Sequence, residues 1–232
     1  MRTISELGRE SRAVAPYPAA TPPRLLPSPA NRILKPVLDW LMAIAGLVFF
    51  APVFLCVLVL IAVFDNGPIF FSQLRLGQGG RLFRCYKFRT MVMDADKVLE
   101  AHLKADSAAR TEWQCTQKLT NDPRVSCLGA FLRKTSLDEL PQLWNVLRGD
   151  MSIVGPRPIL TSEMWRYGDK LSHYYAVRPG ITGLWQVSGR SDTTYEERVA
   201  LDCQYAETQT LRMDLKIILR TFRVVLFCKG AR

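Results

Sequence analysis

The sequence predicts a mainly helical α+β protein, in which a re-entrant membrane helix precedes a cytoplasmic domain with a small sheet and interfacial amphipathic helices. Three observations indicate this fold. Residues 40–64 form an uncharged apolar run with Pro52 at its middle. Two strand-like segments, 69–73 and 82–88, flank a glycine-rich turn. Near the C-terminus, cationic side chains recur at helical spacing beside apolar ones.

Residues 1–34 are predicted to form a disordered or extended tail. Half of the fourteen prolines lie within the first 36 residues, and no hydrophobic period accompanies them. The apolar run begins too late for a secretory signal, and no small-residue cleavage site follows it. We therefore expect the chain to remain anchored.

The membrane element is predicted over 35–66. Its 25 uncharged residues would span roughly 37 Å as a straight helix, which exceeds the ~30 Å core of a bilayer. A proline inside a helix removes one hydrogen bond, so we expect the helix to break at Pro52. Basic residues flank both ends, which favours a segment that enters and leaves the cytoplasmic face. An ordinary kinked transmembrane helix remains the alternative.

Length and composition restrict the function. A chain of 232 residues can build one domain with a core besides the membrane element. The net charge of +10 requires nucleic acid, anionic lipid headgroups or phosphorylated substrates as partners. The six cysteines include no Cys-x-x-Cys pair, which indicates reduced thiols in the cytoplasm. Only two histidines occur, so a histidine-based zinc site or a Ser/His/Asp triad is not favoured.

The cytoplasmic domain is predicted over 67–232. After the hairpin, mixed charges at helical spacing predict a helix within 91–110, and another is expected from 126 to 133. A C-terminal helix follows, whose basic stripe consists of Arg212, Lys216, Arg220 and Arg223. This helix either lies in the headgroup plane or packs on the domain core, and the upstream membrane segment favours the first interpretation.

Asp138 and Glu139 are the candidate catalytic residues. Together with Ser136 they match a capping box, which would put both carboxylates in the first turn of a helix, where the helix dipole favours ionisation. An ionised carboxylate can attack phosphorus or hold a hard divalent cation. The pattern alone also fits two residues that merely cap a helix.

Several arginines strengthen the catalytic interpretation. Arg157 lies between two prolines, which hold the backbone extended and allow its guanidinium to be aimed at a phosphate. Arg133 precedes the carboxylates by five residues, and Arg178 stands before Pro179 and Gly180. Cations concentrated around one carboxylate pair indicate a preorganised anion site.

The same residues belong to a longer series of motifs. In chain order these are Lys87-Phe88-Arg89-Thr90-Met91, Asn121-Asp122-Pro123-Arg124, Leu137-Asp138-Glu139-Leu140-Pro141-Gln142-Leu143-Trp144-Asn145-Val146, Gly149-Asp150-Met151-Ser152, Val154-Gly155-Pro156-Arg157-Pro158 and Arg178-Pro179-Gly180-Ile181-Thr182-Gly183. From about 35 to 227 the chain closely resembles the bacterial sugar transferases, and among them the small monotopic polyprenyl-phosphate hexose-1-phosphate transferases.

The resemblance implies transfer of a hexose 1-phosphate from a UDP-hexose to undecaprenyl phosphate, with UMP released and Mg²⁺ required. Asp138 matches the family's nucleophile, which forms a covalent phospho-sugar, and Glu139 the metal-binding glutamate beside it. Arg133 and Arg157 match arginines that hold substrate phosphates, and we expect Arg178 and Lys87 to join them. Asp138 would share the metal with Glu139.

The resemblance also implies a setting. The enzyme would act at the cytoplasmic face of a bacterial inner membrane, on anionic lipids, in exopolysaccharide or capsule synthesis. The family breaks its membrane helix at a Ser-Pro pair, whereas this chain has Ala51 before Pro52. A sub-pattern at 184–190 is similar to members that handle glucose or galactose 1-phosphate. The sequence decides neither between these sugars nor whether the protein is a homo-oligomer.

Two other functions are also compatible with the sequence. In one, the protein is a non-catalytic basic membrane scaffold, with the carboxylates as helix caps and the arginines on lipid headgroups. In the other, it is a membrane-tethered nucleic-acid binder, although no recognisable binding motif supports this. Only the transferase interpretation explains the carboxylate pair, the proline-flanked Arg157 and the interrupted membrane segment together, so we expect no nucleic acid partner.

Overall fold

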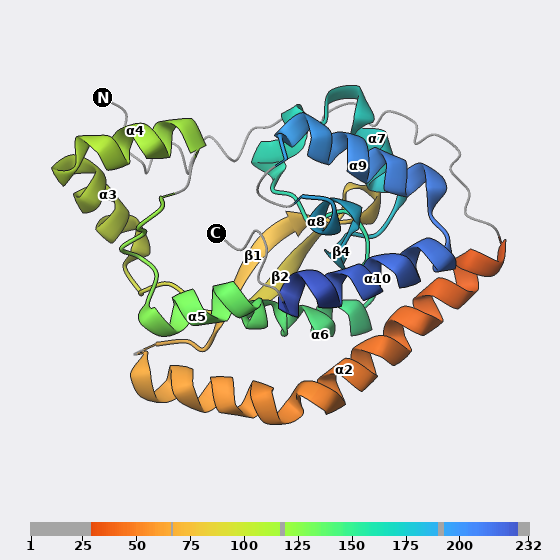
Figure 1. Ribbon diagram of the computed structural model, residues 1–232, viewed down its shortest axis with the longest axis horizontal. Helices are drawn as coiled ribbons and strands as arrows, with labels where there is room; N and C mark the ends of the chain where they lie inside the picture. The colour runs from red at the N-terminus through yellow and green to blue at the C-terminus, as the bar shows by residue number, and fades with distance from the viewer. Residues whose placement is uncertain (1–28, 66, 117–118, 190–192, 227–232) are drawn as a thin grey trace.

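The computed structural model describes residues 29–65, 67–116, 119–189 and 193–226 of the chain. One long helix, α2 (Pro29–Phe64), runs along one edge of a domain made of shorter helices and two small sheets (Figure 1). The arrangement confirms the predicted mainly helical α+β class.

Two details of α2 differ from the sequence predictions. The helix begins at Pro29, so residues 29–34 are helical rather than part of the tail, whose remainder lies outside the described residues. It also continues through Pro52 as one helix, and Figure 1 shows that it bends near its middle. The predicted break is therefore a bend, because a proline removes one backbone donor and can kink a helix without ending it.

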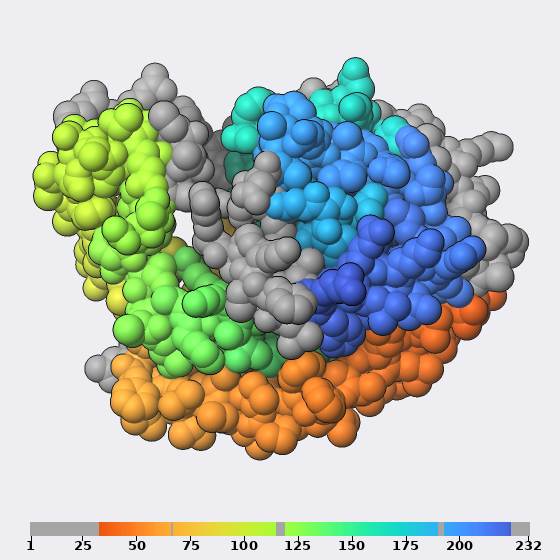
Figure 2. Space-filling model, in the orientation of Figure 1, coloured from red at the N-terminus to blue at the C-terminus, as the bar shows by residue number. Residues whose placement is uncertain are grey.

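One side of α2 faces the domain. Asp39, Ala43, Val57 and Ile61 are buried, and their spacings place them on a single side of a helix. Most other apolar side chains of α2 are exposed, including Val48, Phe49, Leu55, Val59 and Val63. Figure 2 shows the outer surface of this helix as one border of the molecule.

Within the described residues, Ile33–Phe64 is the segment long and apolar enough to cross a membrane. Only 11% of its apolar window is buried against the rest of the chain. A core helix of a soluble protein would bury such a surface, and exposed apolar patches of this size mark interaction sites. The exposed surface of α2 therefore indicates membrane association.

The two sheets are small. Strands β1 (Phe70–Leu76) and β2 (Leu82–Phe88) form an antiparallel hairpin around the single turn η2 (Gln78–Gly80), which confirms the predicted hairpin. Strands β3 (Ser152–Val154) and β4 (Gly180–Thr182) pair in parallel. The second sheet brings together two segments that the sequence alone did not pair.

Short helices enclose the sheets. They are α3 (Ala95–Ala105), α4 (Ser107–Thr116), α5 (Cys127–Thr135), α6 (Gln142–Leu147), α7 (Leu171–Ala176), α8 (Leu184–Val187), α9 (Tyr195–Thr208) and α10 (Leu211–Leu226), with the 3₁₀ segments η3 (Leu137–Glu139), η4 (Thr161–Arg166) and η5 (Gly168–Lys170). Helix α5 confirms the prediction for 126–133, because the Ser126 side chain accepts the N–H of Gly129 and caps it. The region 91–110 contains two helices, which separate at Asp106.

The core holds the strands against the helices. One cluster joins Ala43 of α2 and Phe83 of β2 to Leu143 and Val146 of α6. A second joins Val154 of β3 to α9 and α10. Together these contacts fix β2, the η3–α6 segment and the β3–β4 sheet around one region of the molecule, where the candidate site lies.

Helix α10 fits both interpretations of its sequence. Asp214 and Ile217 are buried and pack the helix on the domain, whereas Leu215, Leu219 and Phe222 are exposed. The basic stripe is exposed as well: Arg212, Lys216, Arg220 and Arg223. An ion pair of 2.7 Å between Lys35 Nζ and Asp214 Oδ2 ties α10 to α2. The free face of α10 thus combines apolar and cationic side chains, and the helix lies beside α2.

Candidate active site

The site is built around three charged side chains from two elements. Lys87, near the end of β2, places its Nζ 2.6 Å from Glu139 Oε1 and 3.3 Å from Asp138 Oδ2. Asp138 is 7% exposed, while the other two side chains are partly accessible. The structure therefore brings together three of the predicted site residues, although 51 residues separate Lys87 from Asp138.

The local structure that presents the carboxylates differs from the predicted capping box. Ser136 has a left-handed backbone conformation (φ 58°) and ends α5 through its N–H, while its side chain caps nothing in η3. The capping-box prediction is wrong because Ser136 serves as the C-cap of the preceding helix. Asp138 and Glu139 instead lie in the 3₁₀ turn η3, and the chain stays right-handed helical through Leu140 and Pro141 into α6.

Burial and charge set the ionisation of these groups. Burial raises the pKa of Asp138 above its ordinary value, and the neighbouring Lys87 opposes that effect. Burial alone would lower the pKa of Lys87, but Glu139 and Asp138 outweigh it and raise the pKa. Lys87 is thus held as a cation beside a carboxylate whose ionised form is costly in this environment.

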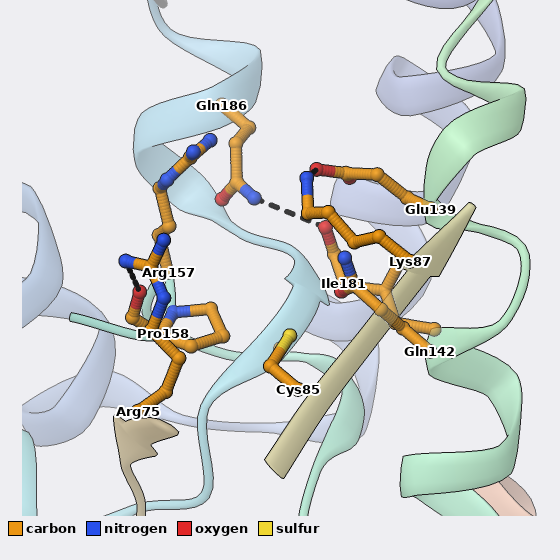
Figure 3. A pocket seen from close by; sticks show the side chains of 10 residues that line it. Arg75, Cys85, Lys87, Glu139, Gln142, Arg157, Pro158, Ile181 and Gln186 are labelled. Carbon is orange, nitrogen blue, oxygen red and sulfur yellow. Dashed lines mark hydrogen bonds and ion pairs between the residues drawn. The ribbon is translucent and has the colours of Figure 1, made fainter. Parts of the chain in front are cut away.

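A pocket opens beside this group. Its lining consists of Arg75, Cys85, Lys87, Glu139, Gln142, Arg157, Pro158, Gly180, Ile181 and Gln186. In Figure 3, Arg75 and Arg157 approach from one side, opposite Lys87, Glu139 and Gln142. A pocket with two guanidinium groups facing a lysine and a carboxylate is suited to an anion that reacts at the carboxylate side.

Four lining residues with polar side chains were missed by the sequence analysis: Arg75, Cys85, Gln142 and Gln186. Arg75 is held by the carbonyl of Pro158 at 3.1 Å and the side chain of Gln73 at 2.7 Å. Its pKa is lowered by burial and by the nearby charge of Arg157. For Cys85 the sequence did contain a signal. Cys85 and Lys87 are two residues apart in the predicted strand, so their side chains lie on the same face, and Cys85 could have been expected beside Lys87.

Glycines as well as prolines position Arg157. A Cβ at Gly155 would collide with the carbonyl of Arg178, and a Cβ at Gly180 with the backbone of Gly155. This close approach lets the loop after β3 run against β4, with Gly180 donating its N–H to Pro156 O at 2.8 Å. The Arg157 guanidinium lies 5.9 Å from the ring centre of Trp185 and lines the pocket.

The other two predicted arginines lie outside the pocket lining. Arg133 donates from Nε to Thr90 Oγ1 at 2.9 Å, and its charge favours ionisation of Asp138. The charge of Arg178 interacts electrostatically with the carboxylate of Asp39 in α2. The structure therefore places Arg133 near Asp138 and Arg178 near α2, and neither side chain lines the pocket.

Asp138 and Glu139 are the two residues of the site that could hold a magnesium ion. Mg²⁺ in phosphoryl-transfer sites is usually held by one or two carboxylates together with substrate phosphates and water. Asp138 and Glu139 are adjacent and share Lys87 as their cationic partner, so one oxygen of each carboxylate faces a common point, where the Lys87 ammonium lies. The described residues contain no group of three or more potential ligands, so substrate and water would complete the coordination.

Comparisons with known proteins show the family to which the chain belongs. The family model described as "Bacterial sugar transferase" matches residues 30–228. The exopolysaccharide production protein ExoY of Sinorhizobium fredii is 46% identical over 203 residues, which cover 88% of this chain and 90% of that protein.

Longer relatives match over the same region. The undecaprenyl-phosphate galactose phosphotransferase of Salmonella typhimurium is 47% identical over 87% of this chain and 42% of that protein. The UDP-glucose:undecaprenyl-phosphate glucose-1-phosphate transferase of Escherichia coli is 39% identical over 84% of this chain and 40% of that protein. The chain thus belongs to the bacterial sugar transferase family and is a transferase.

Proposed function

We propose that this transferase moves a hexose 1-phosphate from a UDP-hexose to undecaprenyl phosphate and releases UMP, as the first membrane step of exopolysaccharide or capsule synthesis. One observation carries the proposal: a buried carboxylate, Asp138, is paired with Lys87, which itself lines a pocket whose opposite wall holds Arg75 and Arg157. The names of the relatives, which include undecaprenyl-phosphate sugar phosphotransferases, support the lipid acceptor.

In the first step, an Asp138 carboxylate oxygen attacks the β-phosphorus of the UDP-hexose. A P–O bond to Asp138 forms, the bond from the β-phosphorus to the bridging oxygen breaks, and UMP leaves with the electron pair. Burial supports this role, because a poorly solvated carboxylate is more reactive than one in water.

In the second step, a phosphate oxygen of undecaprenyl phosphate attacks the same phosphorus. The bond to Asp138 breaks, the carboxylate is regenerated, and the product is a lipid diphosphate hexose. The soluble donor and the lipid acceptor need not occupy the pocket together, so ping-pong kinetics follow.

The surrounding residues have separate tasks. Arg157 and Arg75 lie on the wall where the phosphates of the donor would bind. Lys87 donates a hydrogen bond that orients the Asp138 carboxylate, and its positive charge balances part of the negative charge there. Arg133 adds positive charge behind Asp138. When bound at Glu139 and Asp138, Mg²⁺ would neutralise charge on the substrate phosphates.

The membrane element fits a lipid substrate. We propose that α2 is re-entrant and that the domain lies on the cytoplasmic face of the inner membrane. The bend in α2, its exposed apolar surface and the exposed apolar and basic side chains of α10 support this arrangement. Cations at the headgroup level would also favour anionic lipids.

The test is UMP release by the full-length protein in nanodiscs with undecaprenyl phosphate and Mg²⁺, using UDP-galactose and UDP-glucose. We expect release with one of them and its loss in Asp138→Asn. Asp96→Asn, an exposed aspartate of α3, is the matched control and should retain activity. Folded protein that releases no UMP from a wider UDP-hexose panel would favour the scaffold function instead.

A further inference from the structure

Gln142 is a buried polar residue without an internal partner. It is 3% exposed, yet its carboxamide has no hydrogen bond to any other residue that the structure describes, and it lines the pocket. Buried amides are nearly always hydrogen-bonded, because an unmet donor or acceptor is costly. An unpartnered carboxamide that lines a pocket is explained if a ligand supplies the partner.

The position of Gln142 identifies that partner. It follows Asp138 by four residues and Glu139 by three, and the backbone between them is right-handed helical. Residues at these spacings share one face of a helix. Figure 3 shows Gln142 pointing into the pocket beside Lys87, on the side opposite Arg75 and Arg157.

We propose that Gln142 is a catalytic residue whose carboxamide N–H donates to a non-bridging oxygen of the phosphoryl group as that group passes to and from Asp138. The inference rests on the proposed function. Charge spreads over these oxygens during phosphoryl transfer, and donors fixed in place stabilise it. An amide suits this position, because Lys87 already balances two carboxylates and a neutral donor adds stabilisation without more charge.

The experiment compares Gln142→Met and Gln142→Glu in the full-length protein in nanodiscs. Both variants keep the length of the side chain, but methionine donates nothing and glutamate only accepts when ionised. The matched control is Gln204→Met, at an exposed glutamine of α9. The readouts are the single-turnover rate of hexose-phosphate attachment to the protein, the affinity for UMP, and the melting temperature.

We expect both Gln142 variants to attach the hexose phosphate roughly 10²-fold more slowly than the native protein. UMP affinity should stay within threefold of native, as should every property of the control. A Gln142→Met rate within threefold of native overturns the inference. A native rate for Gln142→Glu together with a slow rate for Gln142→Met also overturns the inference. The side chain at 142 would then act as an acceptor of a hydrogen bond, for example from a sugar hydroxyl, and not as a donor to the phosphoryl group. If Gln142→Met fails to fold, Gln142→Glu still decides.

Failure of the proposed function is recognised separately, by a native protein that attaches no hexose phosphate. In that case orthovanadate, which resembles a phosphoryl group in transfer, is the probe. Roughly tenfold weaker vanadate binding by Gln142→Met, with native-like melting, would support the Gln142 inference independently. Unchanged vanadate binding, or none by the native protein, would overturn it.

Discussion

Asp39 in α2 accepts a hydrogen bond of 3.0 Å from the backbone N–H of Ile153 in β3, across 114 residues of sequence. Lys35, one turn earlier, donates to the carbonyl of Val154 at 3.1 Å. Helix α2 is thereby bonded directly to the strand that leads into Arg157. Lys35 and Asp39 thus connect this apolar helix to the segment that carries the wall of the candidate pocket.

Loss of this connection should affect both stability and donor binding. Asp39→Ala leaves the Ile153 N–H without its acceptor, which costs about 1–3 kcal/mol. We expect a lower melting temperature and a higher KM for the UDP-hexose, because Arg157 loses support. Asp39→Asn retains an amide oxygen and should lie closer to native. Equal melting and equal KM for Asp39→Ala and the native protein would contradict this coupling.

The pH dependence of the transfer rate should reflect the ionisation of the Asp138 carboxyl group. Burial raises its pKa above the ordinary 3.8, and the nucleophile must be ionised, so the acidic limb of kcat/KM should lie above that of an ordinary aspartate. Lys87→Met removes the nearest cation that favours the carboxylate, so the acidic limb should move further upward in pH. The control is Lys97→Met, at an exposed lysine. A limb that moves downward in Lys87→Met would contradict the assignment.

Binding of the UDP-hexose should depend on the planar geometry of the Arg157 guanidinium as well as on its charge. Arg157→Lys keeps the charge but loses the planar fork that can hold a phosphate through two bonds. We expect roughly a tenfold rise in KM for the UDP-hexose. Arg81→Lys, at an exposed arginine, should behave as native. The steady-state kinetics of both variants test this, and an unchanged KM in Arg157→Lys would remove Arg157 from the phosphate site.

The basic stripe of α10 should make transfer sensitive to lipid charge. Near an anionic surface each cation contributes about 1 kcal/mol. We expect the double variant Lys216→Gln/Arg220→Gln to lose most of the rate increase that phosphatidylglycerol produces in nanodiscs. The matched control removes Lys97 and Lys104 of α3, which are both exposed. Equal lipid dependence of the two double variants would speak against a headgroup role for α10.

Asp202 should make stability depend on pH. Burial raises its pKa to about 6, above the value of an unfolded aspartate, so the folded state binds the proton more tightly. Stability is then highest below pH 4 for this group and falls as pH rises to about 6. Asp202→Asn removes this fall, so relative to native it should gain on the order of 1–3 kcal/mol between pH 4 and 7. Melting curves at both pH values measure the difference, and parallel curves would contradict the shift.

Local patterns in the sequence predicted local structure well. The hairpin of β1 and β2 and the Ser126 cap of α5 follow from alternation and capping within short segments. The capping box at Ser136 failed because the same residue ends the preceding helix, a competition that the four-residue pattern does not contain. The bend at Pro52 replaced a break because the rest of α2 remains helical.

The site was only partly predictable for a related reason. Asp138 and Glu139 form a local motif, and proline neighbours mark Arg157. The roles of Arg75 and Gln142 depend on how the hairpin and α6 are placed around the β3–β4 sheet. That sheet needs Gly155 and Gly180 in close contact, which is a tertiary relationship. Lys87 was expected on substrate phosphate, and its position between two carboxylates appeared only with the fold.

Intact mass spectrometry can detect a covalent phospho-sugar on Asp138 directly. The full-length protein is mixed with the UDP-hexose and Mg²⁺ in the absence of undecaprenyl phosphate, and the mass is recorded before and after addition of the lipid. We expect one added hexose phosphate on Asp138, which disappears when the lipid is supplied and never forms in Asp138→Asn. UMP release without any adduct, or an adduct that persists in Asp138→Asn, would contradict it.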